Sequence, residues 1–322
     1  MVYLVTGGAG FIGTNYCLYF LDIKFHKDDI LVVVDKLSYA SNDVIKEKAN
    51  NKNLFFIKED ITHIRKMDEI FKRFTPDFVI NFAAETHVDT SIKKPDIFIK
   101  NNVEGLLNLL KLSVKYKIKR FHQVSTDEVY GDTPLSSSYR FKEIDSLHPS
   151  NPYSVSKASG DLLTLAFART YRLDVTISRC SNNYGRYQYK EKLIPLAIGK
   201  ATNNENIPVY GNGNNIRDWI NVKDHVRAID FIVEKGNKGE IYNVSTHNEL
   251  SNLEVVEKIL KELRKPTTLI KFVKDRKGHD KRYALDTTKL EDLLSKNLDD
   301  ERASYLFKEL QNKEKELSFV NF

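Results

Sequence analysis

Three polar residues end a strand-like apolar run in the first half of the chain. The segment QVSTDEVYGD, from Gln123 to Asp132, presents Thr126, Asp127 and Glu128 shortly before Gly131. Carboxylates are poor strand formers, so two of them in succession need a reason. Two carboxylates in different surroundings can divide into a general acid and a general base. A solvated loop is the alternative while these residues are considered by themselves.

A second candidate pair follows in the segment YSVSK. Tyr153 and Lys157 are four residues apart, which places them on one face of a helix. A phenol has a pKa near 10, so it becomes a useful base only where a nearby cation favours its anion. The 16 tyrosines of this Lys-rich chain would give about two such pairs by chance, and an ordinary amphipathic helix is the alternative. The position just after the strand with Ser125 and Thr126 favours the chemical interpretation.

A glycine-rich turn near the N-terminus predicts a dinucleotide site. In TGGAGFIG, Gly7, Gly10 and Gly13 lie between the first strand and a helix that opens near Phe11. Such glycines let the backbone approach a pyrophosphate, which binds the free N–H groups at the helix N-terminus. Asp35 ends the next strand, where an acid can hold a ribose diol and would repel a 2′-phosphate. The pattern therefore favours NAD over NADP.

The elements that must position these residues alternate in type through the first half. Apolar runs rich in β-branched residues predict parallel strands buried on both faces. They are YLVTG, ILVVVD, LFFIKED, DFVINFAA, RFHQVST and DVTISR. The segments Asn102 to Lys117 and Tyr153 to Tyr171 are predicted helices. The prediction is an α/β fold, a Rossmann-type doubly wound parallel sheet with a smaller C-terminal α/β substrate-binding domain.

The composition shifts after Ser181, where Gly and Asn clusters such as YGNGNN appear. We expect an NAD-binding domain over residues 1–180 and a nucleotide-sugar-binding region over 181–322, with some later segments returning to the first domain. In an open parallel sheet, ligands bind beyond the carboxyl ends of the strands. The STDE segment should therefore face the cofactor crevice. Both acids reach one substrate only if the chain leaves the sheet there, because side chains alternate along a strand.

The overall composition bounds the class of protein. The 322 residues include 41% hydrophobic and 29% charged residues, a profile typical of a globular protein. Only Cys17 and Cys180 are present, no run is apolar enough for a membrane helix, and no basic segment precedes an apolar one at the N-terminus. We expect a cytoplasmic protein with no membrane or nucleic-acid partner. The net charge of +6 comes from scattered lysines and suits a small anionic ligand such as a diphosphate.

Two cationic segments lie in the second half, and no metal-ligand spacing accompanies them. RDW begins at Arg217, and RKGHDKRY runs from Arg276 to Tyr283. Arginine can clamp a diphosphate with two hydrogen bonds, although a solvated basic loop is nearly as good an interpretation. The histidines show no HxxxH pattern and the cysteines no CxxC pair, so we expect no metal site.

Taken together, these residues resemble the nucleoside-diphosphate-sugar branch of the extended short-chain dehydrogenase/reductase family, and within it the dTDP-glucose 4,6-dehydratases. The likeness spans residues 2–290. The TDE triplet and SNNYG are more specific than the glycine loop, because the equivalent strand of epimerases usually lacks both acids. The other matching stretches are TGGAGFIG, DKLSYAS, AAETHVDTSI, YSVSKASGD, CSNNYGRYQYKEKLIP, YGNGNNIRDWINVKDH and GHDKRY.

The resemblance implies a lyase that dehydrates a nucleoside-diphosphate-glucose with bound NAD. Tyr153 would take the proton of the C4 hydroxyl, with Thr126 and Lys157 assisting. Glu128 would remove the C5 proton, and Asp127 would protonate the departing C6 hydroxyl. The implied partner is a second copy of the chain, joined through the two helices predicted above.

The family pattern also implies binding residues. Those for the cofactor are Gly7, Gly10, Phe11, Ile12, Gly13, Asp35, Lys36, Ser38, Asp60, Ile61, Ala83, Ala84, Tyr153, Lys157 and Asn183. Those for the nucleotide sugar are Thr86, Thr126, Asn182, Lys192, Leu193, Pro208, Tyr210, Arg217, Asn252, His279 and Tyr283.

The chain departs from the family pattern in three places. Thr86 stands where serine is usual, Arg186 and Lys190 stand where prolines are usual, and the segment beyond Thr288 lacks the customary Leu-Gly-Trp. Three alternatives stay open: a nucleotide-sugar 4-epimerase, a dehydratase that prefers UDP-glucose to dTDP-glucose, and a catalytically silent NAD-binding scaffold. Thymine and uracil differ by one methyl group, worth only about 1 to 3 kcal/mol in an apolar pocket.

Overall fold

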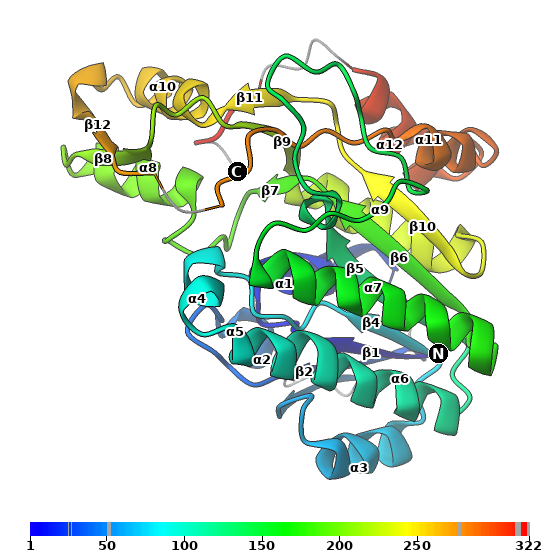
Figure 1. The fold of residues 1–322 in the computed structure, drawn as a ribbon. Coiled ribbons are helices and arrows are strands. Elements are labelled where there is room, and N and C mark those ends of the chain that lie inside the picture. Colours follow the sequence, from blue (N-terminus) through cyan, green and yellow to red (C-terminus); the bar gives the residue numbers. More distant parts are fainter. Residues whose placement is uncertain (25, 27, 50–52, 276–277, 313–316, 321–322) are drawn as a thin grey trace.

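A parallel sheet forms the centre of the molecule (Figure 1). The computed structural model describes residues 1–24, 26, 28–49, 53–275, 278–312 and 317–320. Among these residues, seven parallel strands pair in the order β10-β6-β5-β4-β1-β2-β3, which is a doubly wound Rossmann order. The strands are β1 (Val2–Thr6), β2 (Ile30–Asp35), β3 (Leu54–Lys58), β4 (Phe78–Asn81), β5 (Arg120–Thr126), β6 (Val175–Cys180) and β10 (Glu240–Val244).

The sheet is apolar on both faces because its strand side chains alternate between two cores. Tyr3 and Val5 belong to the core on one face, while Leu4 belongs to the core on the other. The first face is covered by α1 (Phe11–Tyr19), the π-helix η1 (Phe20–Lys24), α2 (Val44–Lys48) and α9 (Val222–Lys235). The second is covered by α3 (Ile64–Phe74), α6 (Leu106–Lys115) and α7 (Pro152–Tyr171).

The predicted strands are confirmed, and one predicted helix begins earlier than expected. All six apolar runs are strands of the central sheet. The helix expected from Asn102 is instead continuous with α5 (Pro95–Phe98) and the π-helix η2 (Ile99–Gly105), which lead into α6. Pro95 occupies the first helical turn, where its missing N–H costs nothing, so the helix starts there. The short helix α4 (Val88–Lys93) precedes it.

A smaller α/β lobe stands over the carboxyl ends of the strands (Figure 1). Its core joins α8 (Leu193–Thr202) and α10 (Asn252–Glu262) to two small sheets of the described chain. The first contains β7 (Asn182–Tyr184), β9 (Ile216–Asn221) and β11 (Glu249–Ser251), and the second contains β8 (Ile207–Tyr210) and β12 (Ile270–Val273), preceded by the 3-10 turn η4 (Thr267–Leu269). The later elements α9 and β10 lie in the layers of the central sheet. The division of the chain into two domains at residue 180 stays a prediction.

The divergent C-terminal tail packs on both lobes. Its helices α11 (Thr288–Ser295) and α12 (Glu301–Gln311) share a core with α9 and β10. Further on, Phe319 is fully buried in the smaller lobe, with its ring edge-on to those of Tyr184 and Trp219. The tail is therefore part of both cores.

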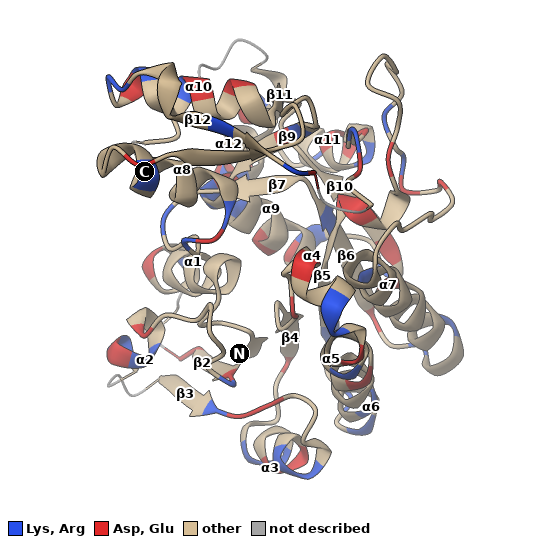
Figure 2. Cartoon of the chain, turned by 60° about the vertical axis from the view of Figure 1, so that its left-hand side comes forward, with Lys and Arg blue, Asp and Glu red and all other residues tan. Residues whose placement is uncertain are grey.

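The surface carries interspersed charges of both signs. Figure 2 shows basic and acidic residues alternating along α3 and α10. Both cysteines, Cys17 and Cys180, are buried and free. Within the described ranges, no helix combines the length and the apolar character that crossing a bilayer requires.

Candidate active site

The glycine loop between β1 and α1 packs backbone against backbone. Gly7 has φ of 72°, and a Cβ on it would lie 2.5 Å from the nitrogen of Ala83. A Cβ on Gly13 would lie 2.2 Å from the carbonyl oxygen of Gly7. Only glycine fits these two positions. The loop therefore keeps the first turn of α1 open to a ligand, as an anion site at a helix N-terminus requires.

Asp35 is held at the end of β2 beside this loop. Its carboxylate accepts hydrogen bonds from the backbone N–H groups of Ala9 at 3.0 Å and Leu37 at 2.8 Å. Burial nevertheless raises the pKa of this carboxyl, partly offset by the two hydrogen bonds. The side chain is thus fixed where the sequence predicted a ribose contact.

The chain leaves the sheet immediately after Thr126. The 3-10 turn η3 (Asp127–Tyr130) follows β5 directly, and Gly131 ends it with φ of 80°. The hydroxyl of Thr126 donates to Asp127 Oδ1 at 3.1 Å and accepts from the N–H of Glu128 at 3.4 Å. The turn therefore ends the strand alternation at the two acids themselves.

The two acids lie in different surroundings. Glu128 lines the cavity described below, whereas Asp127 does not line it and is only 3% exposed. Burial and, after it, the charge of Glu128 raise the pKa of Asp127 to about 8, against the opposing effect of the Arg217 cation. Its Oδ2 atom is buried without a hydrogen-bond partner among the described residues. The direction of this shift favours the protonated form of the Asp127 carboxyl.

Tyr153 and Lys157 share one buried face of α7. The capping box of Asn151 and Ser154 fixes the start of this helix. Lys157 Nζ donates to the carbonyl oxygen of Val124 on β5 at 2.6 Å, and burial lowers the pKa of the ammonium. Burial, reinforced by the charge of Glu128, raises the pKa of Tyr153, while a hydrogen bond with Thr126 lowers it.

All predicted cofactor residues line one cavity of about 310 Å³. This volume is at the lower end of the range for small-molecule sites. Ser125 Oγ, Ser181 Oγ and Gln188 Oε1 belong to residues that line it and are buried without a partner among the described residues. A buried polar atom without a partner is costly, so these atoms call for a polar ligand. The glycine cradle, the Asp35 carboxylate and these atoms fit a dinucleotide such as NAD.

The predicted substrate residues fall into two groups. Thr86, Thr126, Asn182 and Lys192 line the same cavity. The other seven do not line it and lie in the smaller lobe or the segment after β12: Leu193, Pro208, Tyr210, Arg217, Asn252, His279 and Tyr283.

Arg217 is less available as a diphosphate clamp than its sequence context suggested. It is only 4% exposed, and its guanidinium donates to the carbonyl oxygens of Ile216 at 2.7 Å and Asp280 at 2.9 Å. It also stacks over the ring of Tyr283, 4.3 Å from the ring centre. Of the second cationic segment, Arg276 and Lys277 lie outside the described residues.

The sequence interpretation missed several lining residues. Cys180 and Ser181 stand at the carboxyl end of β6, so the strand-end rule that identified Thr126 could have found them. Gln188 and Glu191 come from the loop after β7, and Asn101 comes from η2. No local pattern marks these three, because only the folded chain brings them to the cavity.

The fold and the cavity define a class: the chain is a dinucleotide-binding protein of the extended short-chain dehydrogenase/reductase type. The family model described as GDP-mannose 4,6 dehydratase matches residues 4–296. The dTDP-glucose 4,6-dehydratase of Haemophilus influenzae is 44% identical over 308 residues, which covers 89% of this chain and 90% of that protein. The chain therefore belongs to the nucleoside-diphosphate-sugar 4,6-dehydratase family.

Solved structures agree with this assignment. DesIV, the dTDP-glucose 4,6-dehydratase of Streptomyces venezuelae crystallised with NAD, is 40% identical, has a TM-score of 0.86, and is matched over 91% of this chain and 90% of its own. The UDP-glucose 4-epimerase of Thermotoga maritima is 29% identical, with a TM-score of 0.82 over 91% of this chain and 92% of its own. The fold alone therefore does not separate dehydratase from epimerase.

Proposed function

We propose that this protein is a lyase that uses bound NAD to dehydrate a nucleoside-diphosphate-glucose to its 4-keto-6-deoxy derivative. The observation that carries the proposal is the pair of adjacent acids in different surroundings. The protonated, buried Asp127 can give a proton, and Glu128 at the cavity wall can take one. A 4-epimerase has no need of such a pair of acids. A catalytically silent scaffold would not need Thr126, Asp127, Glu128, Tyr153 and Lys157 together.

Oxidation at sugar C4 comes first in this scheme. NAD, when bound, supplies the hydride acceptor for C4 and later returns the hydride to C6. Tyr153 removes the proton of the C4 hydroxyl, and Thr126 holds the phenol through their hydrogen bond. Lys157 lies one turn further along α7, where its cation would work against the burial that raises the pKa of the Tyr153 phenol.

Loss of water follows because a 4-ketone acidifies the C5–H bond. Glu128 takes the C5 proton, the C5–C6 double bond forms, and the C6–O bond breaks. Asp127 donates its proton to the departing oxygen, which leaves as water. Oxidation and reduction balance within one turnover, so no NADH is released.

For the substrate base, we propose thymine, because the relative from Haemophilus influenzae and DesIV carry the name dTDP-glucose 4,6-dehydratase. UDP-glucose is the alternative. The product class would make this reaction an early step of deoxysugar biosynthesis of the rhamnose type. We infer a cytoplasmic location from the expected solubility of the substrate and the reduced cysteines.

Isotope transfer tests this function directly. From dTDP-glucose deuterated at C4, the product should carry the deuterium at C6, and product made in heavy water should gain deuterium at C5. Mass spectrometry and NMR of the product provide the measurement, and UDP-glucose under identical conditions tests the base. Free NADH in proportion to product would indicate a dehydrogenase, whereas the 4-epimer with its C6 hydroxyl intact would indicate an epimerase.

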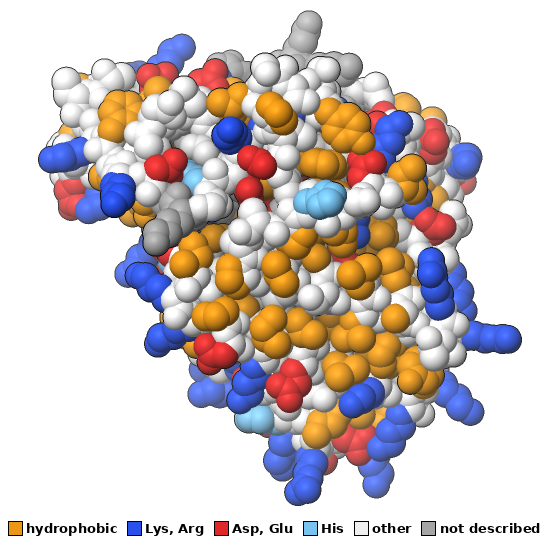
Figure 3. Space-filling model, in the orientation of Figure 1, with side chains coloured by type: hydrophobic (Ala, Val, Ile, Leu, Met, Phe, Trp, Pro, Cys, Tyr) orange, Lys and Arg blue, Asp and Glu red, His pale blue; other side chains and the backbone are white. Residues whose placement is uncertain are grey.

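We also propose that two copies of the chain pair through α6 and α7. Figure 3 shows hydrophobic side chains gathered on the face that these helices present. Exposed apolar residues of α7 and of the π-helix η2, which leads into α6, include Ile99 at 47%, Val155 at 41% and Leu162 at 59%. An apolar surface of this kind is typical of a protein interface.

A charge placed on this face should separate the copies. Leu162→Asp is expected to change the mass measured by light scattering from that of a dimer to that of a monomer, at an unchanged circular-dichroism spectrum. Leu298→Asp, at another residue exposed to 47%, serves as the control and should leave the dimer intact. A wild-type protein that is monomeric at micromolar concentration would rule out the proposed dimer.

A further inference from the structure

Lys36 follows Asp35 at the end of β2, and its ammonium group is held by hydrogen bonds and ion pairs within the protein. Its Nζ atom donates to Glu85 Oε1 at 2.7 Å and to Asn101 Oδ1 at 2.9 Å, and lies 3.9 Å from Asp60 Oδ2. An ammonium group has three N–H donors. Two of them have a hydrogen-bond acceptor in the protein, and the carboxylate of Asp60 lies too far away for a hydrogen bond but close enough for an ion pair. Although Lys36 lines the cavity, its charge is therefore largely balanced within the protein.

The acceptors of Lys36 are themselves fixed. The N–H of Glu85 donates to Asn102 Oδ1 at 2.8 Å, and its carbonyl oxygen accepts from Asn102 Nδ2 at 3.0 Å. Asn102 is 4% exposed and also bonds Ser156 Oγ on α7 at 2.9 Å. Asn101 and Asn102 both belong to the π-helix η2. The π-helix η2 therefore supplies one hydrogen-bond acceptor of the lysine, Asn101, and positions the other, Glu85, through Asn102.

The charges around Lys36 add up to an excess of negative charge. The carboxylates of Asp60 and Glu85 surround its ammonium, and Asp35 precedes it in the chain. A 2′-phosphate on the adenosine ribose would bring nearly two further negative charges to this end of the cavity. Sites that accept such a phosphate supply a free cation for it. Lys36 is the cation in the right place, and it is already neutralised.

We propose that Glu85 is a specificity-determining residue that makes the cavity select NAD over NADP by fastening Lys36. The selection is usually attributed to an acid such as Asp35 at the strand end, which binds the ribose diol. Here a second residue acts through the lysine: Glu85 withholds the cation that would otherwise pair with a 2′-phosphate. This inference rests on the proposed function, since it assumes that the cavity binds NAD.

Calorimetric titration with NAD and with NADP, on protein freed of cofactor, tests the inference without any activity assay. Glu85→Ala should lower the NADP dissociation constant relative to that of NAD by about tenfold, because the freed ammonium can pair with the phosphate. In the double variant Glu85→Ala/Lys36→Met the gain should disappear. Glu59→Ala is the matched control, because Glu59 also lines the cavity but its carboxylate pairs with the ring of His63, at 2.7 Å, and not with Lys36.

Three results would overturn the inference while leaving the proposed function intact. They are an unchanged NADP-to-NAD ratio in folded Glu85→Ala, an equal gain in Glu59→Ala, and a gain that persists without Lys36. If Glu85→Ala does not fold, Asn101→Ala releases the same ammonium from its other tether and should shift the ratio about threefold in the same direction. Failure of the wild-type protein to bind NAD would instead refute the proposed function, and this inference with it.

Discussion

At the scale of single residues, Asp127 has the most consequential environment. The folded protein holds its proton up to a pKa of about 8, whereas the unfolded chain releases it near 3.8. A general acid acts in its protonated form, so the water-loss step should weaken as the pH rises through about 8. Burial destabilises the ionised form of this carboxyl and so raises its pKa. The raised pKa lets the group act as a proton donor near neutral pH.

We predict that Asp127→Asn leaves C4 oxidation intact and slows water loss by at least about 100-fold, because an amide cannot deliver the proton. Rapid-mixing absorbance of reduced nicotinamide should show oxidation without return of the hydride. Tyr153→Phe should have the opposite phenotype and block oxidation itself while NAD still binds. Normal water loss in Asp127→Asn would refute the general-acid role.

The same pKa shift makes a prediction about stability. Between about pH 4 and pH 8 the folded protein binds a proton that the unfolded chain does not, so this residue lowers the free energy of unfolding as the pH rises. Asp127→Asn should remove most of that decline, roughly 3 to 4 kcal/mol between pH 5 and pH 8. Urea titrations of the wild-type protein and of Asp127→Asn at pH 5 and pH 8 measure the free energies of unfolding. If these change equally with pH in the two proteins, Asp127 is already ionised at neutral pH in the folded state.

At the scale of elements, the contact of the glycine loop with α1 has no room for a methyl group. We predict that Gly13→Ala destabilises the protein by about 2 kcal/mol or more and weakens NAD binding at least tenfold, because the new Cβ would overlap the backbone of Gly7. Gly199→Ala is the matched control. It lies in α8 with no atom within 4 Å of the new Cβ and should stabilise by about 0.5 to 1 kcal/mol. Thermal melts and calorimetry give both values, and equal effects at the two glycines would contradict the argument.

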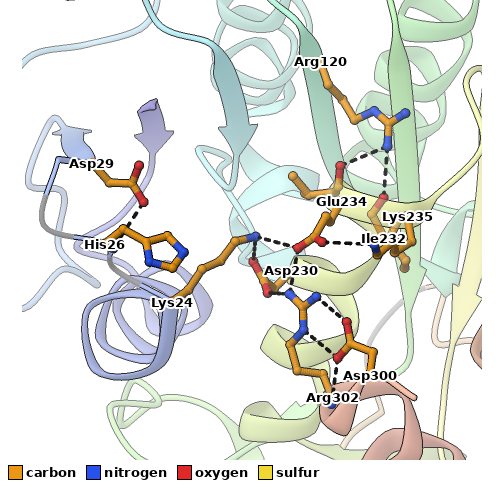
Figure 4. A network of polar contacts seen from close by, with 11 residues as sticks. Lys24, His26, Asp29, Arg120, Asp230, Ile232, Glu234, Lys235, Asp300 and Arg302 are labelled. Atoms are coloured by element: carbon orange, nitrogen blue, oxygen red, sulfur yellow. Dashed lines mark hydrogen bonds and ion pairs between the residues drawn. The ribbon is translucent and has the colours of Figure 1, made fainter. Parts of the chain in front are cut away.

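At the scale of the whole molecule, a charged cluster ties the C-terminal tail to the central layers (Figure 4). Asp230 of α9 is fully buried and pairs with Lys24 of η1 at 2.6 Å and with Arg302 of α12 at 2.7 Å. Arg302 also bonds Asp300 and Glu234. Ion pairs thus connect the tail helix α12 to α9 directly and, through Asp230, to η1.

We predict that Asp230→Asn lowers the free energy of unfolding by about 2 to 4 kcal/mol, since two cations lose their buried counter-ion. The exposed pair of Lys66 and Glu69 provides the control, and Lys66→Ala should change stability by less than about 0.5 kcal/mol. Chemical denaturation measures both. A loss at Asp230 no larger than at Lys66 would mean that the tail docks through its apolar contacts alone.

The sequence by itself determined the order and kind of the elements and most of the residues around the cofactor cavity. Strand runs such as ILVVVD are readable because a strand buried on both faces must be apolar throughout, and the glycine loop because only glycine fits it. Thr126 and Asp35 were found because parallel strands present their carboxyl ends to ligands.

Only the tertiary structure decided the features that depend on distant segments meeting. The pKa of Asp127 depends on burial and on Arg217 from the smaller lobe, and the engagement of Lys36 depends on Glu85 and Asn101 from other elements. The helix start at Pro95 and the docking of the tail on Asp230 and on the Tyr184–Trp219 pair were likewise invisible in local patterns. Local propensity and periodicity act over a few residues, whereas burial and charge pairing are properties of the packed whole.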